Sequence, residues 1–215
     1  MFNFQEKMRD LLDHIDKLKK SNINKIVKRR INEFSKIKNK SSDIIFEELC
    51  FCIMTANCSA ERCIEVQDRV GDGFQILDEV TLSQKLKSFG YRFPNIRAKY
   101  IVEAREHKEE LKKILETQTN LNELRDWIVN NIKGLGYKEA SHFLRNIGYT
   151  GYAIIDFHII DVLVNFNIIS KPKTLTRKRY LEIEEILNKI ALELDLNLGE
   201  LDLFMWYLET GKILK

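Results

Sequence analysis

A lysine and an aspartate have the clearest potential for chemistry in this sequence of 215 residues. Lys138 follows the two glycines of IKGLGY, and Asp156 precedes the apolar run FHIIDVLV. An uncharged lysine amine can attack an electrophilic carbon, and a nearby carboxylate can stabilise positive charge that develops there. The alternative is that the lysine is an ordinary surface residue and that the aspartate only caps a helix.

The segment just before Lys138 is expected to be a tight hairpin. Residues 132–137 link two helical patterns, and Gly134 and Gly136 allow positive φ angles and the close approach of another backbone. The second helix would start with unpaired N–H groups, which bind phosphate without reading base sequence. A glycine pair before a helix is also common as a simple turn.

The helix after the hairpin is predicted to have two different sides. Its apolar residues gather on one side at helical spacing: Ala140, Phe143, Leu144 and Ile147. Lys138, His142 and Arg145 gather on the opposite side, which we expect to be turned away from the core. Lys138 would then meet DNA that is held by the hairpin.

Asp156 is well suited to start the next helix. The residues Ala153, Ile154 and Ile155 are poor helix starters, whereas aspartate is a good N-cap. A carboxylate fixed at this point, after a short loop that contains glycine, would lie near the front of the preceding helix. We therefore expect Lys138 and Asp156 to face one cleft.

The composition favours helices joined by short loops. Two prolines and nine glycines leave little material for a sheet with many turns, so we expect an all-α fold. Helices are expected at 21–38 and 43–56, the second apolar nearly all round, and at 199–209 before Gly211. Three further helices are expected to begin at capping residues, namely Thr81 (ending at Gly90), Asn120 and Thr176.

The net charge and the cysteines limit the classes of function that the sequence allows. The net charge of +3 does not by itself indicate nucleic acid, although residues 17–40 hold ten Lys/Arg against the single acid Glu33. That stretch is predicted to be a solvated amphipathic helix, or a basic surface that steers DNA. The four cysteines, Cys50, Cys52, Cys58 and Cys63, lack metal-ligand spacing. We expect reduced thiols, no metal, no membrane span and a cytoplasmic location.

Gly134, Gly136, Lys138 and Asp156 match the hairpin, lysine, glycine-rich loop and aspartate of the helix-hairpin-helix superfamily of DNA base-excision glycosylases. Within it the chain is most similar to the archaeal-type 8-oxoguanine DNA glycosylase/lyases, through TAN at 55–57, YRF at 91–93 and the ending WYLETGKILK. The loop NIGYTGYAIID lacks the proline of many relatives, and no four-cysteine pattern follows to hold an iron–sulfur cluster.

The resemblance implies one domain over residues 1–215, with two helical lobes, a cleft between them and the hairpin at about 123–147. It implies a bifunctional enzyme that acts as a monomer, without a cofactor, on double-stranded DNA containing 8-oxoguanine. Asp156 would stabilise charge on the sugar, and Lys138 would form a Schiff base that leads to β-elimination. Lys138 has to react as an uncharged amine, which burial or a neighbouring cation such as His142 or Arg145 would favour.

The resemblance also implies a set of DNA contacts. Asn57 would fill the gap left by the flipped nucleotide, and Arg92 and Phe93 would contact the opposite base. His142 would lie at the DNA, while Trp206 would stack on the damaged base and Lys215, with its terminal carboxylate, would make polar contact with it. Each residue has a plain alternative as a helix end, surface charge, core aromatic or frayed terminus.

Two other functions stay open at this point. The same scaffold could act on another lesion, such as an oxidised pyrimidine or a mispaired base. It could also be a non-catalytic DNA-binding module that grips phosphates through the hairpin and uses Asp156 only as a helix cap.

Overall fold

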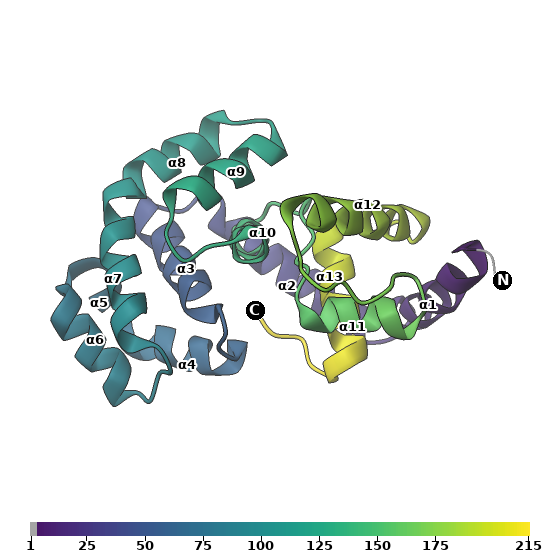
Figure 1. The fold of residues 1–215 in the computed structure, drawn as a ribbon, viewed down its shortest axis with the longest axis horizontal. Coiled ribbons are helices and arrows are strands. Elements are labelled where there is room, and N and C mark those ends of the chain that lie inside the picture. Colours follow the sequence, from purple (N-terminus) through teal and green to yellow (C-terminus); the bar gives the residue numbers. More distant parts are fainter. Residues whose placement is uncertain (1–3) are drawn as a thin grey trace.

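The computed structural model describes residues 4–215 and is built from α-helices, with no β-strand in that range (Figure 1). The predicted all-α fold is therefore confirmed. In chain order the elements are α1 (Phe4–Lys19), α2 (Ile23–Ile37), α3 (Ser42–Thr55), α4 (Ala60–Val70), α5 (Gly73–Ile76), α6 (Glu79–Ser88), α7 (Pro94–Ala104), the 3-10 helix η1 (Arg105–His107), α8 (Lys108–Thr117), α9 (Leu121–Asn131), α10 (Tyr137–Asn146), α11 (Phe157–Asn165), α12 (Arg177–Glu193) and α13 (Leu198–Thr210).

The helices form two lobes, each with its own apolar core. The first lobe contains α3 to α9. The second combines α1 and α2 with α11, α12 and α13, so it is assembled from both ends of the chain (Figure 1). Helix α10 lies between the lobes and contacts α3 and α9 on one side and α2 on the other. One domain over residues 1–215 stays a prediction, and residues 1–3 lie outside the described residues.

Helix α3 is the centre of the first lobe. It was predicted to be apolar nearly all round, and the structure confirms this, because Phe46, Leu49 and Phe51 have no exposed surface. Burial of such side chains stabilises the fold by about 1.5–3 kcal/mol each. The central position of α3 therefore fixes the place of its C-terminal end, next to Asn57.

Capping residues and glycines in the sequence correctly predicted most of the helix ends. The side chains of Asn120 and Thr176 accept backbone N–H groups at the starts of α9 and α12, and Gly90 (φ +68°) follows α6 in the left-handed conformation, as expected. The predicted start at Thr81 is wrong. The cap of α6 is Asp78, whose carboxylate accepts both the backbone N–H and the hydroxyl of Thr81, at 3.0 and 2.7 Å.

The basic stretch near the amino terminus is an amphipathic helix, as predicted. Val27 and Phe34 of α2 are buried in the second lobe, while most of its lysines and arginines are exposed. Within residues 4–215, no helix has the length and apolar character that crossing a bilayer requires.

Candidate active site

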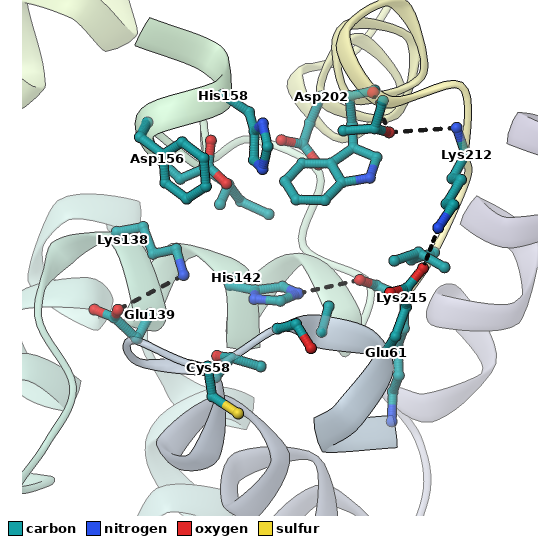
Figure 2. A pocket seen from close by; sticks show the side chains of 18 of the residues that line it. Cys58, Glu61, Lys138, Glu139, His142, Asp156, His158, Asp202, Lys212 and Lys215 are labelled. Carbon is teal, nitrogen blue, oxygen red and sulfur yellow. Dashed lines mark hydrogen bonds and ion pairs between the residues drawn. The ribbon is translucent and has the colours of Figure 1, made fainter. Parts of the chain in front are cut away.

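A cavity of about 820 Å³ opens between the two lobes (Figure 2). Its walls come from the turn after α3, the first turns of α10 and α11, helix α13 and the segment that follows α13. Cavities of about 300–1,000 Å³ are typical of sites that enclose a small molecule or one nucleotide-sized group. Lys138 and Asp156 both line it, so the expectation that they face one cleft is confirmed.

The hairpin places Lys138 at the start of α10. Gly134 has a φ of +87°, and an added Cβ would lie 2.5 Å from the Tyr100 ring, so this turn needs glycine. Gly136 directly precedes the helix. Lys138 has a side-chain exposure of 25 %, and its Nζ lies 3.6 Å from Oε1 of Glu139. The amine is thus held at the cavity wall by its own neighbour in sequence.

The predicted unpaired N–H groups at this helix start are partly occupied. Gly136 has no side chain to cap α10, but its backbone N–H donates to Oε2 of Glu139 at 3.2 Å. A phosphate that binds the Gly136 N–H has to displace this carboxylate. Phosphate binding by Gly134 and Gly136 stays a prediction.

Asp156 is the N-cap of α11, as expected. Its Oδ1 accepts the backbone N–H of Ile159 at 3.0 Å, which fixes the carboxylate at the front of the helix. Figure 2 shows the side chains of Asp156 and Lys138 directed into the same space. The two groups approach the cavity from the starts of two different helices.

The polar side of α10 is buried, contrary to the expectation that it is turned away from the core. His142 is 6 % exposed and Arg145 is 3 % exposed, because the second lobe and the segment after α13 cover them. Burial lowers the pKa of His142 well below its usual value, so this ring is neutral near pH 7. The proposal that His142 acts as a cation beside Lys138 is therefore wrong. Whether His142 contacts DNA stays a prediction.

Arg145 is also engaged elsewhere. Its NH2 lies 3.6 Å from Oδ2 of Asp202, and its guanidinium lies 4.6 Å from the centre of the Phe34 ring. The positive charge of Arg145 is thus shared with a carboxylate of α13 rather than aimed at Lys138.

Asp202 should give the fold a measurable pH dependence. Burial raises its pKa to about 7, against the opposing attraction of Arg145. The folded state therefore holds this proton more tightly than the unfolded chain, and the stabilisation is complete below about pH 4 and lost as the pH rises through 7. The thermal midpoint of the wild type relative to Asp202→Asn should fall between pH 4 and 7. A difference that is constant or grows over this range would contradict the assignment.

Three predicted DNA contacts come from the first lobe. Asn57 is exposed in a left-handed conformation (φ +62°) directly after α3, and it lines the cavity. Arg97 steadies this turn by donating from NH2 to the Ala56 carbonyl at 2.8 Å. Arg92 also lines the cavity and lies over the ring of Phe93, 4.9 Å from its centre. Phe93 itself is half-buried and does not reach the cavity wall.

Of the two predicted base-contacting residues, Trp206 lies on the second lobe and Lys215 reaches the first lobe. Trp206 of α13 lines the cavity and packs edge-on against His158, with 4.5 Å between ring centres. The segment after α13 runs toward the first lobe (Figure 1). There Lys215 pairs through Nζ with the buried carboxylate of Glu48 at 2.6 Å, and its backbone oxygen accepts from Nε2 of His142 at 3.3 Å.

Several residues that line the cavity were not predicted as site residues, among them Cys58, Glu139, Phe157, His158 and Asp202. The sequence held a signal for two of them. His158 stands two residues after Asp156, and Asp202 is an acid inside the apolar run LDLFMWYL, where a buried polar role is expected. Phe157 is 65 % exposed at the cavity, which is unusual for a large apolar side chain.

The cysteines behave as buried thiols. All four are free, and burial raises the pKa of Cys50 and Cys52 well above the ordinary value. Cys58 differs, because its contact with Cys63 lowers its pKa to about 7 at the cavity wall. Residues 4–215 contain no group of three or more His, Cys, Asp or Glu side chains arranged to hold a metal ion.

The chain is similar to known proteins over most of its length. The family model for 8-oxoguanine DNA glycosylase matches residues 27–196. An 8-oxoguanine DNA glycosylase/AP lyase of Methanocaldococcus jannaschii is 53 % identical, over 95 % of this chain and 99 % of the relative. A protein of the same name from Korarchaeum cryptofilum is 48 % identical, over 96 % of this chain and 98 % of the relative.

A solved structure agrees with these sequence matches. The M. jannaschii 8-oxoguanine glycosylase/lyase in complex with a 15mer DNA containing 8-oxoguanine superimposes with a TM-score of 0.92 and 52 % identity, covering 95 % of this chain and 99 % of that one. The similarity thus includes the fold of both lobes. The chain belongs to the 8-oxoguanine DNA glycosylase family and has its helix-hairpin-helix fold.

Proposed function

We propose that this protein removes 8-oxoguanine from duplex DNA and then cleaves the strand at the resulting abasic site. The observation that carries the proposal is the cavity that receives an amine from the start of α10 and a carboxylate from the start of α11. A base inside a duplex cannot reach this cavity, so the nucleotide has to leave the stack. The proposal extends to this chain the activity for which its relatives are named.

Base removal requires the stabilisation of positive charge on the sugar. As the C1′–N9 bond breaks, the deoxyribose ring becomes cationic and the base leaves with the bonding electrons. Asp156 provides a fixed negative charge beside that ring, because its position is set by the cap of α11. A preorganised charge of this kind costs no reorganisation during the reaction.

Lys138 then supplies the nucleophile. Its amine forms a bond to C1′. One amine proton then passes to the ring oxygen as the C1′–O4′ bond breaks, which leaves a 4′-hydroxyl and an open sugar joined to Lys138 as a protonated imine. The imine acidifies the proton on C2′; its removal expels the 3′ phosphate as the C3′–O bond breaks. Hydrolysis of the imine releases Lys138 unchanged. Base removal and strand cleavage thus share one site.

DNA is proposed to be held from both lobes. Gly134 and Gly136 would grip a phosphate beside the cavity. Asn57 stands at the rim with its side chain exposed, which suits it to enter the gap in the duplex, and Arg92 with Phe93 would face the opposite strand. Trp206 presents an aromatic wall on which the extruded base can stack.

Lys215 is proposed to help read the damaged base through its backbone oxygen and the segment it anchors. Lys215→Ala removes the partner of the buried Glu48 and should detach that segment. Excision of 8-oxoguanine should fall roughly ten- to a hundredfold, because contacts misplaced by about 1 Å have effects of this size. Cleavage of a preformed abasic site, which presents no base, should fall much less.

The matched control for Lys215 is Lys212→Ala. Lys212 lies in the same segment and, like Glu61, lines the outer part of the cavity, but the pair is well exposed, with 59 % and 53 % of the two side chains accessible to solvent. Surface pairs contribute about 0–1 kcal/mol, so the loss of excision should be far smaller than for Lys215→Ala. Equal losses in the two variants would show that Lys215 has no special role.

The experiment that tests the activity is borohydride trapping of the wild-type protein on a panel of single-lesion duplexes. We expect the covalent adduct and strand cleavage with 8-oxoguanine, and much less with an oxidised pyrimidine or a mispaired base. Preferential trapping on one of the other duplexes would assign a different substrate. The absence of any adduct would leave a DNA-binding module.

We also propose that the protein acts as a monomer in the cytoplasm. One chain contributes lining residues from both lobes, including Asn57, Lys138 and Trp206. Four free cysteines fit a reducing compartment. Size-exclusion chromatography with light scattering on the complex with a 15-base-pair duplex tests the stoichiometry.

A further inference from the structure

The segment that leads to Asp156 is held by side chains from other helices. Residues 152–156 form no helix or strand, although Ala153 and Ile155 are almost fully buried. Buried backbone N–H and C=O groups need partners, and a segment without regular structure cannot supply them itself. The segment also contains no proline to restrict it. Its fixed shape therefore depends on groups from elsewhere.

Tyr180 of α12 satisfies two of these backbone groups. Its hydroxyl, on a side chain that is 1 % exposed, donates to the Ala153 carbonyl at 2.7 Å and accepts the Ile155 N–H at 3.2 Å. The Ser141 Oγ of α10 lies 3.2 Å from the same oxygen. One phenol oxygen thus connects the segment before Asp156 to the helix that carries Lys138.

Glu184, one turn further along α12, binds a third backbone group of the segment, the Ala153 N–H. Its Oε1 accepts the Ala153 N–H at 3.0 Å, and both its oxygens pair with the buried guanidinium of Arg125, at 2.6 and 2.8 Å. That guanidinium also lies 5.5 Å from the centre of the Tyr180 ring. A paired carboxylate in this place resists displacement, because moving it would leave Arg125 charged and buried.

We propose that Tyr180 and Glu184 are positioning residues that act through Asp156. They fix the backbone of Ala153 and Ile155, three and one residues before Asp156, relative to α10 and hence to Lys138. This inference rests on the proposed function. A shift of about 1 Å in a catalytic group can lower a rate by 10²-fold, so loss of these hydrogen bonds should act on base removal.

The test uses the ratio of two rates measured on the same variant, so that the concentration of folded enzyme cancels. For each variant, the single-turnover rate of 8-oxoguanine excision is divided by the rate of borohydride trapping on a preformed abasic site, which skips base removal. Tyr180→Phe should lower this ratio about tenfold. Asp156→Asn calibrates the direction and size of the change. Thermal unfolding shows that each variant is folded at the assay temperature.

The matched control is Tyr149→Phe. Tyr149 also uses its hydroxyl to bind one backbone carbonyl, that of Leu115 at 2.6 Å, but it does not touch residues 153–156. Its ratio should stay within about twofold of the wild type, since only a distant hydrogen bond is lost. Glu184→Gln is the second test variant, and it decides the matter if Tyr180→Phe does not fold.

The outcomes separate the two proposals. If Tyr180→Phe lowers excision and trapping by the same factor while Asp156→Asn lowers the ratio, Tyr180 is only structural and the positioning role is overturned. If neither variant changes the ratio, the role of Asp156 in base removal fails, and the positioning role fails with it. A lowered ratio in both variants, with Tyr149→Phe unchanged, supports both proposals.

Discussion

Replacing Lys138 by glutamine is expected to abolish the borohydride adduct and to lower strand cleavage by about a thousandfold or more. Glutamine keeps most of the length and the polarity of the side chain but has no nucleophilic amine, so no imine can form. Stability should change little, because Lys138 is one-quarter exposed and makes only a 3.6 Å contact with Glu139. The measurement is denaturing electrophoresis of the protein–DNA adduct on an 8-oxoguanine duplex.

Lys133→Gln is the matched control for this prediction. It makes the same change in the same hairpin, but Lys133 is 66 % exposed, pairs with Glu103 and does not line the cavity. Its adduct should form as in the wild type. If Lys138→Gln traps as efficiently as Lys133→Gln, another amine is the nucleophile and the mechanism has to be reassigned.

The second large effect is expected for Asp156→Asn. Base excision should fall roughly 10²- to 10³-fold, because the fixed negative charge beside the sugar is lost. Asparagine caps helices about as well as aspartate, so the start of α11 should survive. The expected result is therefore a folded protein with slow excision, measured as a single-turnover rate with enzyme in excess.

Asp78→Asn is a control for the capping role alone. Asp78 caps α6 in the same manner, through the Thr81 N–H, and it does not line the cavity. Its excision rate should equal that of the wild type. If Asp156→Asn also excises at the wild-type rate, Asp156 is only a cap, and the non-catalytic alternative gains support.

The contrast between Asp78 and Asp156 shows what local sequence can decide. Both are good caps, and a cap depends on partners only two or three residues away, so Asp156 was identified correctly. Asp78 and Thr81 are both capping residue types and lie only three residues apart. Asp78 is the cap because its carboxylate accepts two hydrogen bonds from Thr81, and the capping-box pattern of Thr81 does not contain this information.

The polar side of α10 shows where periodicity stops being informative. Helical spacing correctly separated the apolar side from Lys138, His142 and Arg145. It could not show what covers the polar side. Asp202 comes from α13 and the oxygen of Lys215 from beyond it, so the burial and neutrality of His142 depend on contacts between distant segments.

The all-α class, most helix ends and the places of Lys138 and Asp156 near two helix starts could be predicted from the sequence, because each depends on neighbours in the chain or on a family motif. The assembly of the second lobe from both chain ends and the single cavity at the two helix starts depend on tertiary packing. The same holds for the hydrogen bonds of Tyr180 to the segment before Asp156. Such contacts are set by packing, and no short window of sequence encodes which distant side chains will meet.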